Sequence, residues 1–208
     1  MAQFRTGDMW SSYDEADLFL ITTNATITIR GTLVMGRGIA RQAKERFPGL
    51  DVALGRQIQA LCGNQGIYGL LISPRWPAAK LGAFQVKRHY SQPASLELIR
   101  HSAAALYAWC AEHPDAQVVL NFPGIGNGRL RRADVLPIVT QLPEQVTIWE
   151  YPPLARRTSD DQPRLESTSK NRPRPQRYRR PPPRYRDCPA IAGDRPLARP
   201  SEHAHCHP

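Results

Sequence analysis

Along the first 151 residues, short apolar runs take turns with segments whose apolar residues recur every three or four positions. The short runs predict buried strands, and they span residues 17–23, 68–73, 81–87, 117–122 and 146–151, with a proline-rich turn between the second and third. The periodic segments predict helices, and they span residues 35–47, 51–61, 95–109 and 133–140. Because strands alternate with helices, an α/β fold with a mainly parallel sheet covered by helices is favoured.

Local residue chemistry predicts where the helices begin and end. Ser95 has the hydroxyl typical of an N-cap, with Glu97 in the first turn after it. Asp51 is expected to cap the helix over residues 51–61 in the same way. A buried stripe on that helix is expected from Val52, Leu54, Ile58 and Leu61. The preceding helix is expected to start at Gly36 to Gly38 and to stop at the Phe-Pro-Gly sequence over residues 47–49.

The chain changes composition after residue 151. Lys and Arg number 28 against 18 Asp and Glu, which gives a net charge of +10. Residues 152–208 hold 13 basic and 6 acidic residues and 12 of the 20 prolines, so this segment carries +7 of that charge. It buries too little apolar area to offset the loss of chain entropy, which predicts a folded domain over 1–151 and a disordered tail over 152–208.

The tail has two interpretations. Its arginines could bind phosphates while Tyr178 and Tyr185 stack on bases, which would make a nucleic acid its partner. Alternatively, it is a solvated linker without a partner. The terminal HAHCHP contains imidazole and thiolate ligands for a transition metal, but without an ordered scaffold we expect no physiological metal site there.

Neither a membrane nor an oxidising compartment is indicated. No run of about 18 apolar residues occurs, and the opening MAQFRTGDMW lacks the pattern of a signal peptide. The four cysteines show no CxxC spacing, so reduced thiols are expected. We therefore expect a cytoplasmic monomer with no membrane partner.

Two glycine-rich segments follow predicted strands, namely GTLVMGRGIARQAKERFPG over residues 31–49 and PGIGNGRL over residues 123–130. The first includes its predicted helix, and the second precedes the predicted helix over residues 133–140. In open α/β sheets, ligands bind beyond the carboxyl ends of the strands. Glycines let the backbone approach a ligand, and a helix N-terminus offers N–H groups to an anion. Neither segment has the GxxxxGK[ST] or GxGxxG pattern. Two such loops favour a phosphate site, whereas a single one would be explained by a tight turn.

Four segments together resemble the macro domain family. RTGDMW resembles the GD start of the family, and TNATITIRGTLVMGRGIARQAKERFPG resembles its first ligand loop. AFQVKRHYSQPASLELI and NFPGIGNGRL resemble segments of the branch that contains the DNA ADP-ribosyl glycohydrolase antitoxins and the terminal ADP-ribose protein glycohydrolases. The resemblance covers about residues 5–151 and implies a three-layer α/β/α sandwich with a mostly parallel mixed sheet.

The resemblance implies ADP-ribose as the ligand, and we expect no cofactor and no metal. Asp8 would accept a hydrogen bond from the adenine amino group, and Asn24 would face the distal ribose. Further contacts are implied in the two loops, from Gly36, Arg37 and Gly38 to the ribose and from Gly124, Ile125, Gly126, Asn127 and Gly128 to the diphosphate. Taken alone, Asp8 is explained by a turn, Asn24 by a strand-end cap and Arg37 by a solvated side chain.

Lys87 decides whether the protein is an enzyme. The resemblance places Lys87 at the position of a lysine that, in this branch, attacks the anomeric carbon of ADP-ribose. Such an attack requires a deprotonated amine, and hence partial burial or a neighbouring cation. The alternative is a surface lysine without a role. His89 is expected on the same side of the strand as Lys87, and it is a candidate proton carrier because imidazole titrates near neutral pH.

One departure from the family pattern bears on the substrate. Relatives that cleave protein-linked ADP-ribose carry an aspartate as general base where this chain has Gly128, so release of ADP-ribose from a nucleobase is favoured. Three alternatives stay open. They are a non-catalytic ADP-ribose reader, a phosphatase acting on ADP-ribose-1″-phosphate, and a nucleic-acid-binding accessory protein whose core is only structural.

Overall fold

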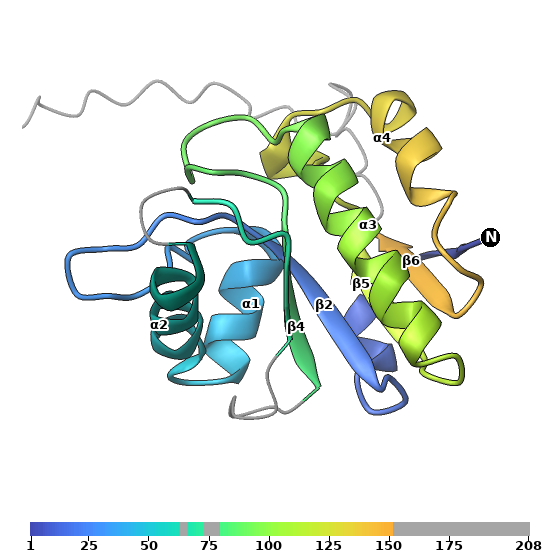
Figure 1. Cartoon of the computed structure of the whole chain (residues 1–208), viewed down its shortest axis with the longest axis horizontal. Helices are drawn as coiled ribbons and strands as arrows, with labels where there is room; N and C mark the ends of the chain where they lie inside the picture. The colour runs from blue at the N-terminus through green and yellow to red at the C-terminus, as the bar shows by residue number, and fades with distance from the viewer. Residues whose placement is uncertain (63–65, 73–79, 152–208) are drawn as a thin grey trace, which may run out of the picture. The chain divides into compact units, whose positions relative to one another are not determined.

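The computed structural model describes residues 1–62, 66–72 and 80–151 (Figure 1). Within these residues, six strands form one sheet in the order β1-β6-β5-β2-β4-β3. Neighbouring strands are parallel except for β3 and β4, so the prediction of a mainly parallel sheet is confirmed. The strands are β1 (Gln3–Thr6), β2 (Leu18–Thr23), β3 (Leu70–Ile72), β4 (Leu81–Gln85), β5 (Val118–Asn121) and β6 (Val146–Glu150).

Two pairs of helices cover the two faces of the sheet (Figure 1). The pairs are α1 (Gly38–Arg46) with α2 (Leu50–Cys62), and α3 (Leu96–Glu112) with α4 (Arg132–Val139). Successive side chains of β2 point to opposite faces. Leu18 and Leu20 join the core beneath α3 and α4, whereas Phe19 and Ile21 join the core beneath α1 and α2. The three-layer α/β/α sandwich is therefore confirmed.

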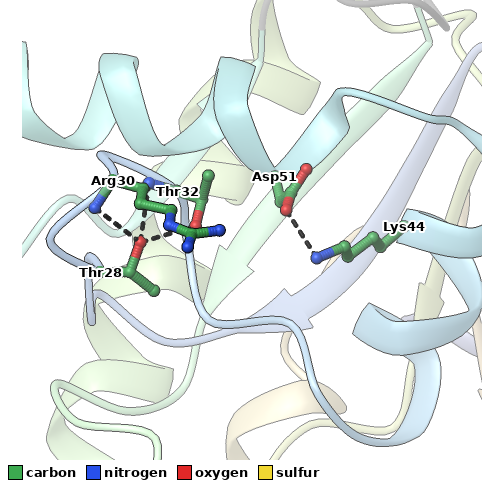
Figure 2. Close-up of polar contacts among 5 residues, drawn as sticks. All are labelled: Thr28, Arg30, Thr32, Lys44 and Asp51. Carbon is green, nitrogen blue, oxygen red and sulfur yellow. Dashed lines mark hydrogen bonds and ion pairs between the residues drawn. The ribbon is translucent and has the colours of Figure 1, made fainter.

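One of the two expected N-caps is confirmed. Ser95 caps α3, where its Oγ accepts a hydrogen bond from the backbone N–H of Leu98 at 3.4 Å. The expectation for Asp51 is wrong, because α2 begins at Leu50 and the Asp51 carboxylate lies 2.7 Å from Lys44 Nζ of α1 (Figure 2). The buried carboxylate thus ties α1 to α2 instead of capping a helix.

The expected stripe on α2 is wrong at its end. Leu54 and Ile58 are buried as expected, and Val52 is half-buried. Leu61, however, has 67% of its surface exposed, and Cys62 is buried in its place. Cys62 lies four positions after Ile58, as Ile58 does after Leu54, so the buried face follows a regular helical spacing.

The hydrophobic pattern did not reveal the first two elements, β1 and the 3-10 helix η1 (Met9–Ser12). All four side chains of β1 are exposed. β1 lies at the edge of the sheet and pairs only with β6, so its residues need not be apolar. A strand held mainly by backbone hydrogen bonds leaves no apolar run in the sequence.

Some predictions concern residues outside the described ranges, namely the tail over 152–208, its terminal HAHCHP and most of the proline-rich turn before Leu81. The division of the chain at residue 151 stays a prediction. Within the described ranges, no helix is long and apolar enough to cross a membrane. Cys62 and Cys110 are buried free thiols.

Candidate functional site

The two glycine-rich loops and Lys87 lie where the parallel strands of the sheet end, which we call its carboxyl edge. β4, β2 and β5 are neighbours and run parallel, so their carboxyl ends meet at this edge. The segments that follow them are residues 24–37, 86–95 and 122–131. Segments far apart in the sequence are thereby placed where open α/β sheets bind ligands.

Asn127 is the residue at which three of these segments meet. Lys87 Nζ donates a hydrogen bond to the Asn127 carbonyl oxygen at 2.7 Å. A Cβ atom added to Gly38 would lie 3.2 Å from Asn127 Nδ2, so the start of α1 lies against the same residue. The first loop, the second loop and Lys87 therefore line a common site.

The first loop is a short hairpin held by its own polar side chains. Asn24 is buried, and its Nδ2 donates to the Val34 carbonyl while its Oδ1 accepts from the Thr26 N–H, both at 2.8 Å. Nearer the tip, the hydroxyls of Thr28 and Thr32 are hydrogen-bonded at 2.7 Å (Figure 2). Asn24 thus shapes the loop, and its contact with a ribose stays a prediction.

Helix α2 supports this hairpin from behind. The Leu33 N–H donates to the Asp51 carbonyl at 2.9 Å. A Cβ atom on Gly55 would lie 2.1 Å from the Gly31 carbonyl oxygen, so only glycine lets the helix backbone come this close. Because Asp51 also pairs with Lys44, the hairpin, α2 and α1 form one packed unit.

The start of α1 presents backbone N–H groups to the site. Arg37 occupies the N-cap position and is exposed, and among the described residues its side chain makes no capping hydrogen bond. Gly36 is also exposed, and a Cβ atom there would meet no atom within 4 Å among the described residues beyond its two neighbours in the chain. Among the described residues, nothing requires a glycine at position 36, and the space in front of it is open to a ligand.

The second loop is fixed to the segment that follows Lys87. The Ala94 N–H donates to the Gly128 carbonyl at 2.8 Å, and the Gly128 N–H donates to the Ile125 carbonyl at 3.1 Å. Gly124 has a φ of +78°, and a Cβ atom there would lie 2.7 Å from Ile99 Cδ1. In the 3-10 turn η2 (Gly126–Gly128), Gly126 and Asn127 are exposed and Gly128 is buried, and the Asn127 carbonyl faces Lys87.

Lys87 lies among cations. Partial burial lowers the pKa of Lys87 below its ordinary value, and the positive charges of Arg129 and then Arg37 lower this pKa further. None of the three side chains forms an ion pair within residues 1–62, 66–72 and 80–151. The site therefore attracts anions, and Lys87 is a free amine more often than a solvated lysine is.

Arg129 is a site residue that the sequence analysis missed. It has the left-handed φ of 62°, which is uncommon for a residue other than glycine. Its guanidinium donates to the Ser91 carbonyl at 2.7 Å, so Arg129 braces the second loop against the segment after Lys87. The signal in the sequence was a basic residue at the end of the GIGNGRL loop.

Gln85 is the second missed residue. It is fully buried in β4, where its Oε1 accepts from the N–H groups of Tyr68 at 2.8 Å and Gly69 at 3.0 Å. Its Nε2 donates to the carbonyls of Gly66 at 2.6 Å and Lys87 at 3.1 Å. Gln85 therefore positions the backbone of Lys87. The signal was a polar residue at the end of the apolar run LGAF.

Asp8 follows β1 at the same edge of the sheet. It is exposed and caps η1, where its Oδ1 accepts from the Trp10 N–H at 3.1 Å. This contact is the turn-forming role expected of Asp8 alone. This hydrogen bond uses Oδ1 and does not involve Oδ2. The contact of Asp8 with adenine stays a prediction.

The expectation that His89 lies on the same side of a strand as Lys87 assumed a strand that extends through both residues. β4 ends at Gln85, so the alternation of a strand does not extend to residues 87–89. His89 is exposed, and its Nδ1 shares a hydrogen bond with Ser91 Oγ at 2.8 Å. No hydrogen bond joins His89 to Lys87 among the described residues, and a catalytic role for His89 stays a prediction.

Solved structures that share this three-layer α/β/α sandwich include macrodomains. No family model and no curated protein matches the chain. Among solved structures, the macrodomain of Mycobacterium tuberculosis DarG is 28% identical with a TM-score of 0.54, over 74% of this chain and 99% of that chain. The predicted resemblance to the macro domain family, and to its branch with the DNA ADP-ribosyl glycohydrolase antitoxins and the terminal ADP-ribose protein glycohydrolases, is confirmed by this similarity to DarG.

Two further structures share the fold. The macrodomain of Thermus aquaticus DarG is 22% identical with a TM-score of 0.51, over 74% of this chain and 99% of that chain. Thermosipho africanus DarTG, solved in complex with ADP-ribose, is 18% identical with a TM-score of 0.53. That match covers 77% of this chain and 44% of the DarTG chain.

Proposed function

We propose that this protein binds ADP-ribose at the carboxyl edge of its sheet and releases it from a modified nucleic acid, with Lys87 as the nucleophile. The observation that carries this proposal is the meeting of Lys87, the start of α1 and the second loop at Asn127. The similarity to the DarTG structure solved with ADP-ribose supports this choice of ligand.

In this proposal, each part of ADP-ribose is matched to a chemically suited group. N–H groups at the start of α1 and in the second loop suit the diphosphate, and the charges of Arg37 and Arg129 favour the same anion. The distal ribose would then lie near Asn24 and Lys87. Asp8, at the end of β1, would accept a hydrogen bond from the adenine amino group.

The proposed chemistry starts from the free amine of Lys87. Its lone pair forms a bond to the anomeric carbon of the distal ribose as the bond from that carbon to the nucleobase breaks. The base leaves with the electron pair and takes a proton from solvent. Water then displaces the lysine and loses a proton to solvent, which releases ADP-ribose and restores the amine. The lowered pKa of Lys87 favours the first step, because only the deprotonated form has a free lone pair.

A non-catalytic ADP-ribose reader is the second candidate. It is favoured by one observation, that no carboxylate among the described residues forms an ion pair with Lys87 to act as its base. Gly128 also supplies no carboxylate. A reader needs only the two loops and the cations around them.

The test compares wild type with Lys87→Arg and Lys87→Ala, and uses Lys80→Ala as the matched control. Lys80 donates to the Asp14 carbonyl at the opposite edge of the sheet, so its loss should not affect the site. Each protein is titrated with ADP-ribose by calorimetry and assayed for ADP-ribose release from an ADP-ribosylated single-stranded oligonucleotide. Arginine keeps the positive charge but does not deprotonate.

We expect Lys87→Arg to bind ADP-ribose but release none, and Lys80→Ala to behave as wild type. Release by Lys87→Arg at the wild-type rate would exclude lysine as the nucleophile. Binding without release by every protein would favour the reader. If wild type binds no ADP-ribose, the proposed ligand is wrong.

A further inference from the structure

The turn directly after Lys87 is held in a single shape. The Gln92 N–H donates to the His89 carbonyl at 3.2 Å, and the Arg129 guanidinium donates to the Ser91 carbonyl at 2.7 Å. The Tyr90 N–H donates to Thr26 Oγ1 at 2.9 Å, which joins the turn to the base of the first-loop hairpin. Side chains from both loops thus hydrogen-bond to the backbone of residues 88–92, which we call the aromatic turn.

This turn displays two rings beside the site. Tyr90 has 53% of its surface exposed, and His89 is also exposed. Their ring centroids lie 4.6 Å apart with an angle of 40° between the planes. No hydrogen bond from the Tyr90 hydroxyl occurs among the described residues, so hydrogen bonding within them does not account for the exposed ring.

The surroundings of the aromatic turn are basic. Arg88 is exposed within the turn, Arg129 binds its backbone, and Lys87 precedes it. In the described part of the chain, none of these three cations is paired with a carboxylate. An exposed aromatic ring within a cluster of unpaired cations is the combination that binds single-stranded nucleic acids, whose bases stack while their phosphates are neutralised.

We propose that the aromatic turn binds the unpaired strand next to the modified nucleotide, with Tyr90 stacked on a neighbouring base and Arg88 near its phosphate. This inference rests on the proposed function for the modified substrate, but strand binding itself can be measured without it. A single strand fits better than a duplex, because duplex bases are already stacked and their faces are not available to the ring.

The experiment measures binding of a fluorescein-labelled, unmodified single-stranded oligonucleotide to the full-length protein by anisotropy. The measurement is made at raised salt, which would weaken any phosphate binding by residues 152–208, and that segment is the same in every variant. The variants are Tyr90→Ala, Tyr90→Phe and the control Tyr107→Ala. Tyr107 is equally exposed, at 56%, but lies on α3 about three turns from its start.

We expect Tyr90→Ala to weaken strand binding roughly tenfold, with Tyr90→Phe and Tyr107→Ala close to wild type. Affinity for ADP-ribose, measured by calorimetry, should be the same in all four proteins. The proposal is overturned if Tyr90→Ala binds the strand as wild type does, if Tyr107→Ala weakens binding equally, if duplex binding falls as much as strand binding, or if wild type binds no strand. If wild type does not bind ADP-ribose, that result would instead count against the proposed function.

Discussion

Replacing Gln85 by leucine tests whether this buried amide holds Lys87 in place. Leucine is similar in size and fits an apolar core, but it makes none of the four hydrogen bonds of the amide. The N–H groups of Tyr68 and Gly69 lose their acceptor, and the carbonyls of Gly66 and Lys87 lose their donor. The backbone that carries the proposed nucleophile is then free to shift.

The magnitude follows from how deeply each group is buried. A buried polar group left without a partner costs about 1–3 kcal/mol. The Gly69 N–H is buried and bears this cost in full, whereas water can reach the half-buried residues Gly66, Tyr68 and Lys87 in part. We therefore expect Gln85→Leu to lower the free energy of unfolding by about 3 kcal/mol. Release of ADP-ribose should fall by about tenfold or more, because small displacements of a nucleophile slow its attack.

Urea unfolding followed by circular dichroism measures the stability, and the oligonucleotide assay measures release. The matched control is Gln141→Leu, the same substitution at an exposed glutamine, which should change stability by less than about 0.5 kcal/mol. A loss below about 1 kcal/mol for Gln85→Leu, together with wild-type release, would refute the positioning role of Gln85.

Three further predictions concern the site and the tail. Gly36→Ala should leave the urea midpoint unchanged, since its Cβ atom meets nothing within 4 Å, yet weaken ADP-ribose binding about tenfold by calorimetry if the ligand lies against this backbone. Gly128→Asp should raise the pKa of Lys87 and move the rise of the pH–rate profile to higher pH, because a nearby carboxylate favours the ammonium form. Its Cβ atom would lie 3.1 Å from that of Ala94, so the pair Gly128→Asp with Ala94→Gly separates crowding from charge. A chain ending at residue 151 should show a smaller salt dependence of oligonucleotide binding than the full chain, because 13 basic residues are removed; equal slopes would exclude the tail as a phosphate-binding segment.

Features that depend on neighbouring residues could be predicted from the sequence. The alternation of strands and helices was correct because burial imposes its period on each segment separately. Ser95 could be predicted as a cap because its partner lies three residues away. The two glycine-rich turns could be located for the same reason, because their glycines are neighbours in the sequence, and their contact with a ligand stays a prediction.

Predictions from local residue chemistry failed where an interaction with another element determined the structure. Asp51 has the side chain of a cap, but Lys44 of the preceding helix competes for its carboxylate, and the ion pair forms instead. β1 left no signal because its stability comes from backbone pairing with β6, at the other end of the domain sequence. Neither outcome could be derived from a window of a few residues.

By itself, the sequence determined the class of fold, the two loops and the identity of the residues that could carry chemistry. The tertiary structure alone decided which of them meet. The parallel pairing of β4, β2 and β5 places Lys87 against Asn127, forty positions later in the chain, and gathers Arg37 and Arg129 around the same amine. The reactivity of a lysine depends on its burial and on charges within a few ångströms. For Lys87, the folded sheet sets both, and the residues next to Lys87 in the sequence do not.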